Sequence, residues 1–188
     1  MEIRNCRIAL VALALALGCG GKTHYVVPEL TGVSPAQGSV QSLVVITGSS
    51  FEGTNSVSFG GAPAPWYKAS GGDQIQAIVP NDACTGSITV QNPAGVRTST
   101  FVFTVTPQIT SIEPASGPVG TLVTVTGFGF YGTTGVAIGG DATGSSTFTY
   151  YDPNTLKVVV GPGAATGPLV VTASGLEATS PASFTVTP

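Results

Sequence analysis

The chain has 188 residues and a net charge of −3, and only 8% of its residues are charged. Typical domains carry about 25% charged residues, so solubility here must come from serine, threonine, glycine and asparagine on outward faces. The basic residues beyond residue 20 do not cluster, which disfavours nucleic-acid binding because phosphate recognition needs several cations on one face. The chain is apolar enough to fold, so we do not expect disorder.

Residues 1–18 have the pattern of a secretory signal peptide. Arg4 and Arg7 precede an apolar run from Ile8 to Leu17, which is too short to span a bilayer. The run ends in Ala16-Leu17-Gly18-Cys19, which resembles the lipobox of bacterial lipoproteins, where a small residue precedes a cysteine that is acylated. The resemblance implies lipidation of Cys19. The alternative is ordinary signal cleavage, which leaves Cys19 as a free or disulfide-bonded thiol.

Residues 19–27 are expected to form a short tether. The eight residues after Cys19 reach at most about 28 Å, so the first domain would lie close to the membrane. Gly20 stands where an aspartate would resemble an inner-membrane retention signal. We therefore expect an exported protein that is anchored in the envelope, at the outer membrane or cell surface if the host is Gram-negative.

The rest of the chain is one pattern that occurs twice, at a spacing of 79 positions in the first half of each copy. A period of about 80 residues is too long for a solenoid repeat and predicts two tandem domains, 28–106 and 107–188. The matching residues are Pro35 and Pro114, Gly48 and Gly127, and Phe51 and Phe130. We expect Phe51 and Phe130 each to fill one end of the core of its domain.

Short β-rich runs recur between turn residues in both copies, and no helical period is present outside the leader. In the runs 43–47 and 122–126, alternate positions are apolar in both copies, whereas Val45 corresponds to Thr124. This period of two predicts an all-β fold of antiparallel sandwiches with one buried face per strand. The predicted core residues are Val44, Ile46, Ile75, Val79, Ile88, Val90, Phe103, Val105, Val123, Val125, Leu156, Val158, Val160, Leu169, Val171, Phe184 and Val186.

Glycine and proline mark the turns. Gly60-Gly61 and its counterpart Gly139-Gly140 predict a hairpin turn. Gly38 and Gly117 each follow a proline by three residues, where a positive φ is expected. The junction at 106–108 has no run of glycine or serine and contains a proline. We therefore expect the two domains to keep a narrow range of mutual angles.

The combined motif resembles the IPT/TIG domain, an immunoglobulin-like sandwich. It runs P-x-x-G, then T-G-x-x-F, then V-x-F/I-G-G, then T-G-x-I/L-x-V, and it covers nearly all of residues 28–188 in two copies. The resemblance implies a fold rather than an activity. Such domains occur in bacterial surface proteins, beside carbohydrate-active enzymes, in receptor ectodomains and in Rel-type transcription factors. The leader and the acidic balance disfavour the last of these.

The chain has few residues of the types that usually carry out catalysis. Its one histidine, His24, lies in the tether, so Cys84 has no base to form a nucleophilic dyad. We interpret Cys84 as a loop thiol, with an intermolecular disulfide as the alternative. The aspartates are isolated, and no calcium loop or His/Cys ligand set occurs. We expect no catalytic residue, no metal site and no cofactor.

Aromatic residues in the middle of each copy are the candidate ligand-binding residues. They are Trp66 and Tyr67 in the first copy and Tyr150 and Tyr151 in the second. If exposed, they could stack on sugars or anchor a protein partner; alternatively, Trp66 covers the sandwich core. The first function is a non-catalytic binding, adhesion or structural spacer module of the cell surface, which could dock another surface protein through an exposed edge strand. The alternative is a glycan-binding module. A flat exposed aromatic platform would favour the glycan, whereas a buried Trp66 and a bare, uncharged edge would favour the protein.

Overall fold

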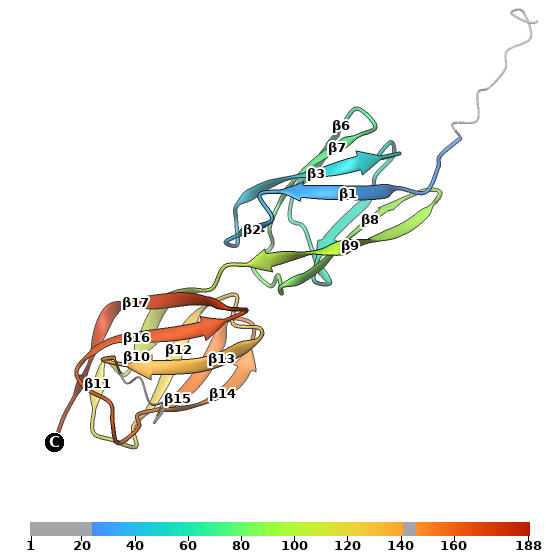
Figure 1. The fold of residues 1–188 in the computed structure, drawn as a ribbon. Coiled ribbons are helices and arrows are strands. Elements are labelled where there is room, and N and C mark those ends of the chain that lie inside the picture. The colour runs from blue at the N-terminus through green and yellow to red at the C-terminus, as the bar shows by residue number, and fades with distance from the viewer. Residues whose placement is uncertain (1–23, 141–145) are drawn as a thin grey trace, which may run out of the picture.

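A computed structural model describes residues 24–140 and 146–188, and the regular structure in these ranges is β-strand. The predicted leader and Cys19 lie outside the described residues. Within the described ranges, no helix has the length and apolar character needed to cross a membrane. Figure 1 shows two β-sandwiches placed end to end along the chain. The all-β fold class is therefore confirmed.

The first sandwich packs a sheet of order β1-β3-β7-β6 against one of order β2-β9-β8-β4-β5. Its neighbouring strands pair antiparallel, except that the short β2 runs parallel to β9. The strands are β1 (Glu29–Ser34), β2 (Gln37–Gly38), β3 (Leu43–Ser49), β4 (Ser56–Phe59), β5 (Ala62–Pro63), β6 (Tyr67–Ser70), β7 (Gln74–Ile78), β8 (Gly86–Asn92) and β9 (Gly95–Val105).

The second sandwich repeats this order, with sheets β10-β12-β15-β14 and β11-β17-β16-β13. The sequence counterpart of β5 falls within residues 141–145, outside the described part of the chain. The strands are β10 (Gln108–Glu113), β11 (Ser116–Gly117), β12 (Leu122–Phe128), β13 (Thr133–Ile138), β14 (Thr147–Asp152), β15 (Thr155–Val159), β16 (Gly167–Ala173) and β17 (Leu176–Val186).

Each sandwich has its own hydrophobic core, and the predicted inward residues form it. Val44, Ile46, Val123 and Val125 are fully buried, as the agreement between the two copies predicts. The remaining predicted core residues are also buried, except Val186, which is half-buried at the C-terminal end of β17. The period of two was sufficient for this assignment because each sheet has one face on the core and one face toward water.

The turn predictions were partly correct. Gly60 and Gly61 have φ values of 56° and 94° and join β4 to β5 in a two-residue hairpin turn, as expected. Gly38 and Gly117 do not have positive φ, so that prediction was wrong. A Cβ atom at Gly38 would lie 2.7 Å from Ser42 Oγ, so close approach of a side chain, and not backbone conformation, favours glycine there.

Side chains of the two sandwiches meet at the junction. Asn154 Nδ2 donates a hydrogen bond of 3.0 Å to Asp82 Oδ1, and Ser174 Oγ donates one of 3.1 Å to Thr85 Oγ1. The half-buried ring of Phe128 packs against the core of the first sandwich. These contacts supplement the short covalent link, and a narrow range of mutual angles between the domains remains our expectation.

Candidate functional site

The four candidate aromatic residues differ in exposure. Tyr151 is 72% exposed, Trp66 42% and Tyr150 40%. Tyr67 is half-buried and packs against the first core. Trp66 is therefore an exposed side chain, and the alternative in which it covers the sandwich core does not hold.

Strand register separates the candidates into two places. Tyr67 pairs with Ala77 on β7, and Phe148 occupies the equivalent place opposite Val158 on β15. Trp66 directly precedes Tyr67, so it lies at the open end of the β6–β7 hairpin. Tyr150 lies toward the closed end of the equivalent β14–β15 hairpin. The two halves of the predicted set thus lie on different sandwiches and at non-equivalent positions.

A β-bulge exposes both tyrosines of β14. Tyr150 pairs with Leu156 and Asp152 pairs with Thr155, so Tyr151 is an extra residue without a partner on β15. A bulge interrupts the alternation of side chains between the two faces of a strand. Consecutive tyrosines can therefore both reach solvent here, which regular alternation would not allow on a strand with one buried face.

A third tyrosine, which the sequence analysis missed, lies beside them. The ring centroid of Tyr131 is 6.4 Å from that of Tyr150, with the ring planes at 82°, and Tyr131 is 52% exposed. This is the edge-to-face arrangement that aromatic pairs prefer. The available signal was that Tyr131 corresponds to Glu52 in the first copy, where an aromatic residue replaces a carboxylate. We call Tyr131, Tyr150 and Tyr151 the junction tyrosines.

Polar groups of both sandwiches surround the junction tyrosines. Asp152 Oδ1 accepts a hydrogen bond of 2.7 Å from the backbone N–H of Asn154, at the tip of the β14–β15 hairpin. The side chain of Asn154 in turn donates a hydrogen bond to Asp82 of the first sandwich. Partial burial raises the pKa of the Tyr150 hydroxyl above its ordinary value, and Cys84 and Asp152 add to the rise. The phenol is therefore neutral at physiological pH and can both donate and accept a hydrogen bond.

Two of the described basic side chains have hydrogen-bond partners of their own. Lys157 Nζ donates a hydrogen bond of 2.7 Å to Thr124 Oγ1 on β12, and Arg97 Nε donates one of 3.2 Å to the carbonyl oxygen of Pro28. The titratable groups that influence the pKa of the Tyr150 hydroxyl are Cys84, Asp152 and Tyr131. Within residues 24–140 and 146–188, no group of three or more His, Cys, Asp or Glu side chains is placed to hold a metal ion.

Cys84 gives a direct test of this environment. It is a half-buried free thiol within the described part of the chain, and partial burial, together with Asp82, raises its pKa. Because the thiolate is the reacting species, alkylation of Cys84 by iodoacetamide should require a higher pH in the folded protein than in urea-unfolded protein. Asp82→Asn should shift the pH dependence of alkylation in the folded protein part of the way toward that of the unfolded protein. Mass spectrometry at the Cys84 peptide measures both, and coincident folded and unfolded curves would contradict the raised pKa.

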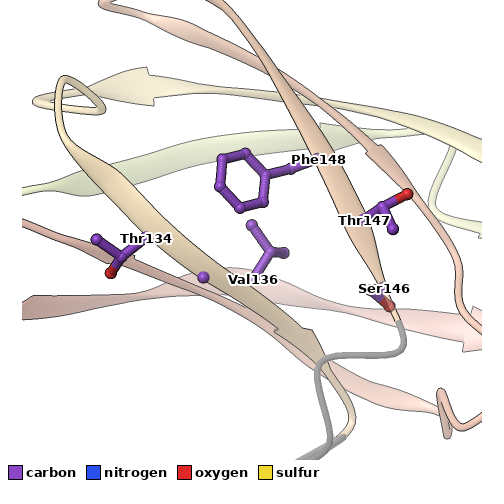
Figure 2. A pocket seen from close by; sticks show the side chains of 6 residues that line it. Thr134, Val136, Ser146, Thr147 and Phe148 are labelled. Carbon is purple, nitrogen blue, oxygen red and sulfur yellow. The ribbon is translucent and has the colours of Figure 1, made fainter.

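A separate hollow of about 350 Å³ lies between β13 and β14 of the second sandwich. Figure 2 shows Phe148 and Val136 close to one another at this hollow, with Thr134 and Ser146 also on its lining. Thr134 Oγ1 donates to the carbonyl oxygen of Thr172 (3.4 Å), and Ser146 Oγ accepts from the backbone N–H of Gly161 (3.1 Å). Both hydroxyls thus take part in hydrogen bonds to the backbone.

The IPT/TIG domain family matches residues 28–105 and 107–187, and the chain therefore belongs to this family. The fold is similar to that of the surface glycan-binding protein PbSGBP-B from Prevotella bryantii, with 16% identity, a TM-score of 0.51, and coverage of 84% of this chain and 42% of that one. A comparison with curated proteins finds no significant match.

A second similar structure is SGBP-B from a complex xyloglucan utilization locus in Bacteroides uniformis. It has 20% identity and a TM-score of 0.38, with coverage of 84% of this chain and 49% of that one. The present chain therefore spans less than half the length of these two structures. At such identities the similarity concerns the fold alone.

Proposed function

We propose that the protein is a non-catalytic binding module of the bacterial cell envelope, held by a lipid anchor on Cys19, and that its ligand is a glycan outside the cell. The observation that carries the proposal is the exposure of Tyr150 and Tyr151. Exposed aromatic rings are unfavourable in water and favourable against the apolar face of a sugar ring or a partner side chain. The printed description of PbSGBP-B as a surface glycan-binding protein supports the choice of a glycan.

The chemistry of the chain supports a binding role over catalysis. The one histidine of the chain, His24, lies ahead of β1 and far along the chain from the junction tyrosines. Nucleophilic catalysis needs a base within hydrogen-bond reach of the nucleophile, and general acid–base catalysis needs a titratable group within reach of the proton that it moves. Asp82 and Asp152 instead hold Asn154 at the tip of a hairpin, which is a structural use of a carboxylate.

The proposed anchor has a test in cells. The apolar run that ends at Leu17-Gly18-Cys19 predicts that a fatty-acid label is incorporated into the wild-type protein and not into Cys19→Ala. Cys84→Ala is the matched control and should keep the label, because Cys84 lies within the folded first sandwich. Labelled protein should be found with the envelope fraction after cell lysis. Incorporation of equal label into wild type and Cys19→Ala would contradict lipidation at this residue.

Native gel electrophoresis through polysaccharides tests the ligand. The mature chain carrying Cys19→Ala should migrate more slowly through gels that contain a neutral polysaccharide, such as xyloglucan or a mixed-linkage β-glucan, than through gels without one. The retardation should persist at high salt, because stacking and neutral hydrogen bonds are little screened. If no polysaccharide retards the chain and immobilised protein instead captures a specific envelope protein, the function is docking to that protein.

A further inference from the structure

We propose that the glycan site is the junction of the two sandwiches, that the junction tyrosines form its floor, and that it takes a single neutral sugar chain. The inference rests on the proposed function, because it names the site and the class of glycan. It assigns Trp66 no part in the site.

Both ring-bearing segments lie beside hydrogen bonds that join the second sandwich to the first. Tyr131 lies in the loop between β12 and β13, and its carbonyl oxygen accepts a hydrogen bond of 3.5 Å from Ser174 Oγ. The single proton of this hydroxyl is shared with Thr85 Oγ1 of the first sandwich, which lies closer, at 3.1 Å. The β14–β15 hairpin that carries Tyr150 is tied to Asp82 through Asn154. Segments whose backbone is held in this way lose less conformational entropy when a ligand binds, which favours affinity.

The geometry of the rings suits a single soluble sugar chain as the ligand. Tyr131 and Tyr150 meet nearly at right angles, so their exposed faces form a corner and not a flat plate. A crystalline polysaccharide surface needs several coplanar rings at once, whereas a single chain can lay consecutive sugar units on differently oriented rings. Tyr151, the most exposed of the three, directly follows Tyr150 on β14, and we assign it to the next sugar unit of the chain.

The charges around the corner select a neutral ligand. The carboxylates of Asp82 and Asp152 lie on either side of Asn154, and each uses one oxygen to hold it. Carboxylates accept hydrogen bonds from sugar hydroxyls, and they repel the carboxylates of uronic acids and the phosphates of teichoic acids or nucleic acids. Lys157 and Arg97, the basic side chains considered above, are engaged with other partners. The neutral phenol of Tyr150 adds a donor.

Calorimetric titration of the mature Cys19→Ala chain with xyloglucan and mixed-linkage glucan oligosaccharides tests the proposal. Tyr151→Ala and Tyr131→Ala should each weaken binding about tenfold or more, whereas Trp66→Ala should stay within about twofold of the parent. Tyr151 and Trp66 are both exposed, so neither change should disturb folding, and thermal unfolding of each variant verifies this. A polygalacturonate titration is the acidic comparison and should show no binding.

The outcomes separate the site from the function. If the parent binds the neutral oligosaccharides and Trp66→Ala abolishes binding while the tyrosine variants retain it, the glycan function stands and the junction site is wrong. If polygalacturonate binds more tightly than the neutral probes, the neutral class is wrong. If the parent binds none of the probes, both the site and the glycan function are overturned. Loss of a captured protein partner in Tyr151→Ala would make the junction a protein-docking site instead.

Discussion

Val125→Asp should unfold the second sandwich, whereas Thr124→Asp, one residue away on the same strand, should leave it folded. Val125 is fully buried on β12, between Ile112 of β10 and Leu156 of β15. A carboxylate without a partner at this place costs several kcal/mol, which is comparable with the roughly 5–15 kcal/mol that stabilises an entire domain. The folded fraction of the second sandwich should therefore fall steeply.

Thr124 points to the outer face, where its hydroxyl accepts a hydrogen bond from Lys157 Nζ. An aspartate there faces Lys157 on β15 and Glu113 on β10, so attraction and repulsion oppose one another and the expected change in either direction is within about 1 kcal/mol. The two variants, Val125→Asp and Thr124→Asp, thus add the same charge and differ only in the face of the strand that carries it.

The measurement can follow the sandwiches separately. Trp66 is the one tryptophan of the chain and lies in the first sandwich, so its fluorescence follows that domain. The second domain can be followed by amide resonances of β12 and β16 in the same urea titration. We expect the Val125→Asp resonances to be those of an unfolded segment in buffer while the Trp66 transition is largely retained. Equal behaviour of the two aspartate variants would show that the strand register is wrong.

Gly127→Ala should also strongly destabilise the second sandwich. A Cβ atom at Gly127 would overlap the backbone carbonyl oxygen of Gln108 on β10 and lie 2.6 Å from Phe130 Cζ. The Phe130 ring is fully buried, so it has no room to retreat, and the β10 backbone is held by its ladder with β12. Overpacking of this kind costs about 1–3 kcal/mol or more, and contact with backbone favours the upper end.

Gly135→Ala is the control for Gly127→Ala. A Cβ atom at Gly135 would have no heavy atom within 4 Å, and its backbone φ is one that alanine can adopt. Its unfolding midpoint in urea should stay close to that of the parent. If Gly127→Ala were as stable as Gly135→Ala, the β10 backbone would have to shift, and loss of the Gln108–Phe128 pairing in amide exchange would reveal it. Gly48 has the same close approach to Glu29 and Phe51, so the effect should be reproduced in the first sandwich.

The sequence alone determined the domain type, its two copies and the inward face of the main strands. Val44, Ile46, Val123 and Val125 were assigned correctly because burial on one face of a sheet imposes a period of two, and a second copy shows which alternation is shared. The Gly60-Gly61 turn was predictable for a similar reason, since a two-residue hairpin with positive φ at both positions is a local requirement of the backbone.

The tertiary structure alone decided which aromatic side chains are available to a ligand. Trp66 and Tyr67 are neighbours in sequence, yet one is exposed and the other packs on the core, because Trp66 precedes the strand that Tyr67 begins. The bulge at Tyr151 depends on how β14 pairs with β15. Tyr131 reaches Tyr150 only after β12, β15 and β14 are assembled. Such placements depend on pairing between distant segments, and no local pattern of residues encodes them.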